Sequence, residues 1–186
     1  FVGANVRKGV QAGYADYIPV FLSETQKLYR CGALPCDVAM IQVCPPDKHG
    51  YVSLGTSVDA TLAAIECAKT VIAVVNPNVP RAWGQAMIPM DMIDIFVEGN
   101  DPLEPAHFSE PNEVETAIGK HCAALIDDGA CLQMGIGAIP NAVLAQLGNH
   151  KNLGVHTEMF ADGVLELVEK GVINGSNKVT DKGKLV

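Results

Sequence analysis

The sequence predicts an α/β fold made of two units. Short apolar runs alternate with helical stretches along the whole chain, which is typical of strands and helices packed in layers. Hydrophobic residues make up 48% of the 186 residues and charged residues only 18%, a composition that favours a globular core over disorder. Residues 99–112 interrupt the alternation with three prolines and no periodicity. We therefore expect one unit over 1–98, a linker over 99–112 and a second unit over 113–186.

The elements of the first unit follow from its apolar runs and turn signals. Strands are expected at the chain start (1–4) and over 36–43, 51–54, 70–75 and 92–97. Helices are expected from Asn5 to Ala12, from a capping box at Ser23 to about Gly32, and over residues 60–69. Asp47, Lys48 and His49 are interpreted as turn residues.

The second unit is expected to begin with a helix capped by Asn112 and Glu115 and stopped by Gly129. A strand running into glycines follows at 131–137, and Pro140 then opens a helix. A further strand is expected over 153–156, a helix over 162–170, and a terminal β-hairpin around the letters DKGK. Both chain ends fall inside predicted structure, which suggests an internal fragment.

Composition excludes several classes of partner. The net charge is −8 and no basic cluster is present, so a nucleic-acid partner is not expected. No apolar run approaches the ~20 residues of a membrane span, so no membrane partner is expected either. The six cysteines lack the CxxC pairs of a zinc site and are interpreted as buried free thiols of a reducing cytoplasm, with no metal expected.

The segment from Gln133 to Pro140 reads QMGIGAIP, a strand that ends in Gly-x-Gly where a helix starts. Backbone N–H groups at such a start have no helical acceptor, so they suit an oxyanion or a phosphate. Pro140 replaces the third glycine of a dinucleotide fingerprint, which argues against an NAD site. A tight turn without a ligand remains an alternative.

Glu158 follows the next predicted strand, within the letters GVHTEMFADG. Open α/β sheets bind ligands at the carboxyl ends of their strands, and consecutive strands are usually neighbours. We therefore expect Glu158 near Gly135–Gly137, where a carboxylate can attack a thioester while the loop stabilises the oxyanion. The alternative is a solvated loop acid followed by Asp162 as a helix cap.

The segments QMGIGAIPNAVLAQL and LGVHTEMFADGVLELVEKGVINGSNK resemble the acetyl-CoA hydrolase/transferase family, most of all its 4-hydroxybutyrate and butyryl-CoA:acetate CoA-transferase groups. Earlier stretches, FVGANVRKGV, ADYIPVFLSE, VVNPNVPRAWG and IDIFVEG, fit the same family pattern. The resemblance implies the CoA-transferase (NagB/RpiA-like) fold. It also implies that 1–98 is the C-terminal part of the first CoA-transferase domain and 113–186 the N-terminal part of the second, catalytic one.

The resemblance implies a class I CoA-transferase that moves CoA between an acyl-CoA and 4-hydroxybutyrate, butyrate or acetate. Glu158 would be the catalytic residue that carries a glutamyl-CoA thioester, and CoA would be a co-substrate. The CoA-contacting segment would comprise Gln133, Gly135, Ile136, Gly137, Ala138 and Ile139. His156 and Thr157 would orient the loop, while Asn76, Asn78, Arg81 and Trp83 either line the cleft or form an ordinary surface loop.

Three functions remain open from the sequence. Acyl-CoA hydrolysis through the same glutamate differs only in water exclusion and acceptor fit, and a non-catalytic interaction piece is a further alternative. A sugar-phosphate isomerase of similar fold would be expected to show Lys or Arg near the glycine loop. The nearest basic residues after that loop are His150 and Lys151, at the far end of a predicted helix. Their distance from the loop argues against the isomerase. The resemblance further implies a cytoplasmic homo-oligomer, and the fragment alone is expected to be inactive.

Overall fold

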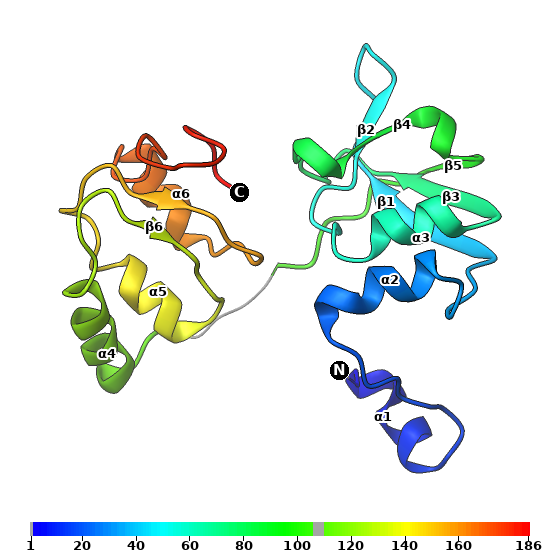
Figure 1. The fold of residues 1–186 in the computed structure, drawn as a ribbon, viewed down its shortest axis with the longest axis horizontal. Coiled ribbons are helices and arrows are strands. Elements are labelled where there is room, and N and C mark those ends of the chain that lie inside the picture. The colour runs from blue at the N-terminus through cyan, green and yellow to red at the C-terminus, as the bar shows by residue number, and fades with distance from the viewer. Residues whose placement is uncertain (1, 106–109) are drawn as a thin grey trace. The chain divides into compact units, whose positions relative to one another are not determined.

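The computed structural model describes residues 2–105 and 110–186. The chain forms two compact units, residues 1–104 and 105–186 (Figure 1). Residues 106–109 of the expected linker lie outside the described residues, as does Phe1.

The first unit is built on a parallel sheet of three strands in the order β1-β3-β5. These are β1 (Val38–Val43), β3 (Thr70–Val75) and β5 (Ile95–Glu98). The register aligns Val38 with Thr70 and Val43 with Val75. One face of β1 and β3 packs into the core, as the predicted β-branched runs require. The strands expected at 36–43 and 70–75 are thus confirmed, the first with a start two residues later.

A two-stranded antiparallel ribbon accompanies this sheet. It pairs β2 (Tyr51–Ser53) with β4 (Met87–Pro89). The strand β2 was expected, whereas β4 has no strand signal of its own: it is three residues long and contains a proline. Its pairing with β2, and the burial of Ile88, create it.

Three α-helices belong to the first unit: α1 (Ala4–Gln11), α2 (Thr25–Arg30) and α3 (Thr61–Cys67). Short 3₁₀ turns occupy Leu22–Glu24, Gly84–Ala86 and Met90–Met92. Helix α1 begins after Gly3, so the expected cap at Asn5 is wrong, and Val2 and Gly3 form no strand. The capping box expected at Ser23 is also wrong, because the 3₁₀ turn takes up that segment and no side chain caps α2.

The second unit contains α4 (Glu113–Ala123), β6 (Cys131–Leu132), α5 (Ala138–Leu144), β7 (Gly154–Val155) and α6 (Gly163–Glu169). The predicted capping box of α4 is confirmed: Asn112 accepts from the Glu115 N–H, and Glu115 accepts from the Asn112 N–H. Helix α4 crosses close to α5 at Gly119, where a Cβ would lie 2.6 Å from the Ala142 carbonyl oxygen. Close packing therefore requires glycine there.

The strands of the second unit are short and parallel. Cys131 aligns with Gly154 and Leu132 with Val155, and Leu153 bridges to Ile173 in the same sense. The strands expected over 131–137 and 153–156 therefore exist but are shorter. Behind them, Leu144, Leu147, Leu153 and Val164 are almost completely buried and form the core.

The terminal β-hairpin expected around DKGK is wrong. Residues 174–186 form no named strand, and the turn there is closed by the Lys184 N–H, which donates to Asp181 O. Val186 instead pairs with the end of β7: its N–H donates to Val155 O and its carbonyl accepts from the Thr157 N–H. A tertiary contact therefore replaces the local hairpin.

All six cysteines are free, but only Cys44 is buried, so the interpretation of all six as buried thiols is wrong. In the part of the chain that the structure describes, no helix combines the length and apolar character needed to cross a bilayer.

Candidate active site

The candidate site begins where β6 and β7 end. Because the two strands are parallel and hydrogen-bonded, the loops that leave their carboxyl ends start side by side. The His156 N–H donates to Leu132 O at 2.9 Å, which extends the pairing to the first residue beyond β7. The topology therefore places the loop from Gln133 next to the loop that contains Glu158, as the sequence analysis expected for these two segments.

The first loop runs from Gln133 to Gly137. Gly137 has φ of 112°, a conformation that L side chains rarely adopt, so the start of α5 depends on glycine at this position. Helix α5 begins at Ala138, earlier than expected, and Pro140 lies within its first turn, where its missing N–H breaks no helical bond. The glycines thus form a sharp passage from strand to helix.

Five consecutive residues of this passage have backbone N–H groups without a partner among the described residues. Within the described part of the chain, the N–H groups of Gly135, Ile136, Gly137, Ala138 and Ile139 donate to no protein acceptor. Asn141 is the first residue whose N–H returns to the loop, donating to Gly137 O. Unpaired donors at a helix start attract negative charge. The passage is therefore chemically suited to an oxyanion or a phosphate oxygen.

Thr157 joins the two loops directly. Its Oγ1 accepts a hydrogen bond from the Met134 N–H at 3.1 Å and donates to Met134 O at 2.6 Å. Met159 O, at 3.1 Å, is an alternative acceptor for the same hydroxyl proton. Met134 directly precedes Gly135, and Thr157 directly precedes Glu158. This contact therefore holds the glycine loop next to the loop that contains Glu158.

Glu158 is exposed, and its carboxylate forms no hydrogen bond or ion pair with any residue that the structure describes. Three exposed apolar side chains lie on the two loops, Ile136, Met159 and Phe160, and a fourth, Ile139, lies in the first turn of α5. An unpaired carboxylate on one loop and unpaired N–H donors on the adjacent loop are the groups that attack on an acyl thioester requires.

Two further residues lie close to the ends of β6 and β7. From the sequence, His156 is expected to orient the loop, and Lys178 is not among the candidate residues. His156 is exposed, and its backbone alone takes part in the pairing with β6. Lys178 is buried, and its Nζ donates to Val155 O and Lys184 O, each at 2.9 Å. No sequence pattern predicts the burial of Lys178, because a lysine among Asn, Ser and Gly residues is typical of a solvated turn.

In the first unit, Asn76 and Asn78 form a closed network after β3. Asn76 is only 1% exposed, and its Nδ2 donates to Gln42 Oε1 and Asp101 O. Its Oδ1 accepts from the backbone N–H and the side chain of Asn78. These partners fix the end of β3 to the chain that follows β5, which is a structural role.

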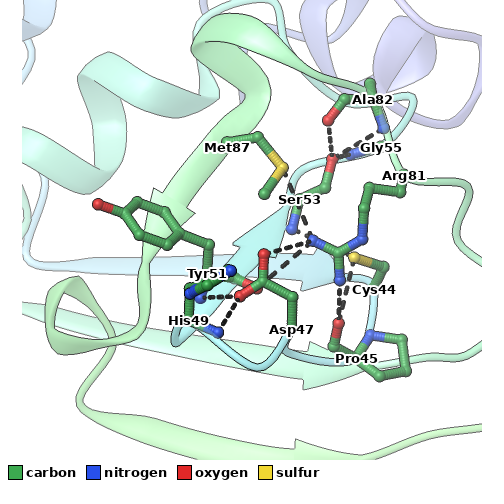
Figure 2. A network of polar contacts seen from close by, with 10 residues as sticks. All are labelled: Cys44, Pro45, Asp47, His49, Tyr51, Ser53, Gly55, Arg81, Ala82 and Met87. Carbon is green, nitrogen blue, oxygen red and sulfur yellow. Dashed lines mark hydrogen bonds and ion pairs between the residues drawn. The ribbon is translucent and has the colours of Figure 1, made fainter.

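Arg81 and Asp47 belong to a second network (Figure 2). Arg81 donates to Pro45 O at 2.5 Å and lies 3.8 Å from the Asp47 carboxylate. Asp47 accepts from the backbone N–H groups of His49 and Tyr51, which confirms the predicted turn. The Tyr51 N–H lowers the pKa of Asp47 below its ordinary value, assisted by the His49 N–H and the Arg81 charge and opposed by partial desolvation.

Ser53 completes this second network. Its buried hydroxyl donates to Ala82 O and accepts from the N–H groups of Gly55 and Ala82 (Figure 2). Ser53 thus anchors the chain that carries Arg81 and Trp83. Trp83 itself is 75% exposed, so its indole ring is open to solvent in this chain.

Neither of two cavities contains a predicted site residue. One of about 90 Å³ lies between α5 and α6, lined among others by Asn141, Gly163 and Glu166, and there a hydrogen bond from Lys170 lowers the pKa of Glu166. The other, about 500 Å³, lies over the sheet of the first unit beside Met40, Gln42 and Asp59. Among the described residues, no group of three His, Cys, Asp or Glu side chains is arranged to hold a metal ion.

Known proteins similar to this chain share both its sequence and its fold. A 4-hydroxybutyrate coenzyme A transferase of Clostridium kluyveri is 52% identical over the whole chain, which covers 43% of that protein. A succinyl-CoA:acetate/propanoyl-CoA:succinate CoA transferase of Fasciola hepatica is 49% identical, with 39% of it covered. The crystal structure of a 4-hydroxybutyrate CoA-transferase from Porphyromonas gingivalis matches with a TM-score of 0.84 and 40% identity, over all of this chain and 47% of that one.

The chain thus spans less than half the length of these relatives. Residues 1–105 match the family model of the acetyl-CoA hydrolase/transferase N-terminal domain. Both the family match and the relatives agree with the resemblance found in the sequence. The chain belongs to the acetyl-CoA hydrolase/transferase family.

Proposed function

We propose that this chain is part of a class I CoA-transferase, which moves CoA between an acyl-CoA and a short-chain carboxylate through a glutamyl-CoA thioester on Glu158. The observation that carries the proposal is the pairing of β6 with β7. It starts the loop of Glu158 next to the loop of residues 133–137, which supports a carboxylate and N–H donors acting on one substrate. The relatives named as CoA transferases support the same chemistry.

The proposed reaction uses Glu158 twice. Its carboxylate attacks the acyl thioester, the C–S bond breaks, and a mixed anhydride and CoA thiolate form. The thiolate then attacks the glutamyl carbonyl, which releases the first carboxylate and leaves the glutamyl-CoA thioester. An acceptor carboxylate attacks that thioester, and the returning thiolate takes the new acyl group and frees Glu158.

The glycine loop is proposed to bind the co-substrate CoA and to stabilise the oxyanion. Each step passes through a tetrahedral oxyanion, which N–H donors stabilise when they lie ~3 Å from it. Gln133 and residues 135–139 would contact CoA, with Gly135 and Gly137 letting it approach the backbone. The exposed side chains of Ile136 and Ile139 would pack against the apolar parts of the substrate.

The fold and the cellular setting are proposed from the same family. We expect the NagB/RpiA-like type of CoA-transferase fold, with residues 1–98 from the first domain and 113–186 from the second, catalytic domain. The substrates would be acyl-CoA and 4-hydroxybutyrate, butyrate or acetate. A cytoplasmic homo-oligomer is the expected form, and the 186 residues alone are expected to be inactive.

Acyl-CoA hydrolysis is the second candidate, favoured by one observation. Glu158 is exposed to solvent in this chain, so water can reach a thioester formed on it. The family name covers both activities. Discrimination depends on whether the complete protein excludes water while it admits a carboxylate.

The experiment that separates these candidates uses the full-length protein. Butyryl-CoA is supplied with radiolabelled acetate, and both labelled acetyl-CoA and total free CoA are measured over time. A transferase converts label into acetyl-CoA with little free CoA. Free CoA released equally with and without acetate would identify a hydrolase, and neither product would point to a non-catalytic protein.

A further inference from the structure

Lys178 stands out as a buried charge that the proposed chemistry does not use. It is 6% exposed, although lysine is almost never buried without a partner. Its Nζ donates to the carbonyl oxygens of Val155 and Lys184, each at 2.9 Å. Within residues 2–105 and 110–186 no carboxylate pairs with it. An ammonium buried with carbonyl partners costs free energy that a neutral side chain would not.

The two carbonyl partners belong to the two segments that meet at the base of the Glu158 loop. Val155 is the last residue of β7, three positions before Glu158. Lys184 lies two positions before Val186, whose backbone pairs with Val155 O at 3.3 Å and with the Thr157 N–H at 2.7 Å. Lys178 and Val186 therefore converge on the same carbonyl group. The ammonium ties the end of β7 to the segment 184–186.

The chain also makes room for this lysine. A Cβ on Gly154 would lie 2.6 Å from Lys178 Cγ and 3.1 Å from its Cδ. Real side chains do not approach so closely, so glycine at 154 and the long stem at 178 are matched. The matched pair places the ammonium at Val155 O without displacing β7.

We propose that Lys178 is a positioning residue for Glu158. It acts by fixing the carboxyl end of β7, from which the Glu158 loop departs. Thr157 fixes the same loop on its other side through Met134. The inference rests on the proposed role of Glu158. If that role holds, freedom gained at the base of the loop lowers the rate, because ~1 Å of misplacement at a reacting centre can cost about 100-fold.

The first test replaces Lys178 in the full-length enzyme. Lys178→Met keeps the stem and removes the donors, and Lys178→Arg keeps charge and donors. Lys182→Met removes an exposed lysine of the following turn, 181–184, as a control. Activity is measured at a temperature where circular dichroism shows each variant folded. We expect kcat of Lys178→Met to fall about 10- to 100-fold with KM for acyl-CoA changed less than about threefold. Lys178→Arg should recover part of the rate, and Lys182→Met should match wild type.

A second pair of variants tests the same contact without touching the lysine. Gly154→Ala drives a methyl group into the Lys178 stem, whereas Gly148→Ala adds one where nothing lies within 4 Å. Gly154→Ala should lower kcat in the same way, and Gly148→Ala should not. The double variant Gly154→Ala/Lys178→Met should lose less than the product of the single losses, because both act on one contact. If Lys178→Met does not fold, this glycine pair decides.

A purely structural lysine would give a different pattern. Lys178→Met and Gly154→Ala would then lower the melting temperature and leave kcat per folded enzyme unchanged, which would overturn the proposal. Failure of the proposed function itself is recognised separately. In that case Glu158→Gln would keep its exchange activity, whatever the Lys178 variants do.

Discussion

The polar loops of the two units differ in whether their hydrogen-bonding groups have partners within the protein. After β3 in the first unit, Asn76 and Asn78 bind each other and neighbouring segments, and Arg81 and Asp47 are held by backbone partners. After β6 and β7 in the second unit, the Glu158 carboxylate has no partner among the described residues. The N–H groups of residues 135–139 likewise have none there.

This difference distinguishes polar groups that stabilise the fold from the groups that we propose bind a ligand. A buried polar group without a partner is costly, so a network that is internally complete stabilises the chain. Donors and a carboxylate left unpaired on adjacent strand ends have no such structural use. We therefore propose that the reacting groups lie in the second unit. The asparagines after β3, which the sequence offered as cleft candidates, are held by partners within the first unit.

Glu158 should show the largest effect. In the full-length enzyme, Glu158→Gln keeps the shape of the side chain but removes the charge, so it cannot attack a thioester. Exchange should fall by several orders of magnitude. Glu158→Asp retracts the carboxylate by one methylene and should lose about 100-fold. Near wild-type exchange in Glu158→Gln, measured with labelled acetate, would show that the unpaired carboxylate is not the nucleophile.

Thr157 should come next, because it links the two unpaired groups. Thr157→Val removes the hydroxyl and leaves the Met134 N–H and carbonyl without their partner. Leaving such groups unpaired costs about 1–3 kcal/mol of stability, and we expect kcat to fall about tenfold through lost positioning. Thr157→Ser retains the hydroxyl and serves as the matched control. Equal kcat in the Val and Ser variants would show that the contact does not position the site.

Asp47 should give the smallest effect, on stability alone. Its pKa is lowered in the folded chain, chiefly by the Tyr51 N–H. Its stabilising contribution is therefore complete above the ordinary value of 3.8 and is lost as pH falls through the lower folded value. The melting temperature of Asp47→Asn should lie below that of wild type at about pH 5–7. This range lies about one pH unit or more above the ordinary pKa of the carboxyl group. The gap should close in stronger acid, with kcat unchanged.

The exposed Asp91→Asn provides the control for that measurement. It should show no melting-temperature difference at any of these pH values. A change in kcat for Asp47→Asn would mean that the first unit's network has a part in the chemistry. A difference that grows with acidity would contradict the sign of the pKa shift.

Some local signals in the sequence predicted local structure, although the caps expected at Asn5 and Ser23 are wrong. The run from Thr70 to Val75 forms β3 with the expected bounds, because β-branched residues suit a buried strand. The capping box of Asn112 and Glu115 is present because both partners lie within one turn. The neighbouring placement of the two candidate loops followed from the preference of consecutive strands for adjacent positions.

Features that depend on distant partners were not predictable in the same way. The strand β4 exists through its pairing with β2, and the expected terminal hairpin is displaced by the pairing of Val186 with β7. The burial of Lys178 depends on Gly154, which is 24 positions away in the sequence. The Thr157 hydroxyl contact with Met134 likewise requires the folded loops. Sequence patterns predict periodic elements and helix caps. They do not predict contacts between residues that are far apart in the sequence.

Chemical trapping shows whether a thioester forms on the Glu158 carboxylate. The full-length enzyme is incubated with acyl-CoA and treated with borohydride, and the peptide that contains Glu158 is analysed by mass spectrometry. A thioester-activated carboxylate is reduced to an alcohol, so the account predicts that Glu158 is modified, that the modification requires acyl-CoA, and that activity is lost in parallel. An enzyme that exchanges CoA yet leaves Glu158 unmodified under these conditions would contradict the covalent mechanism.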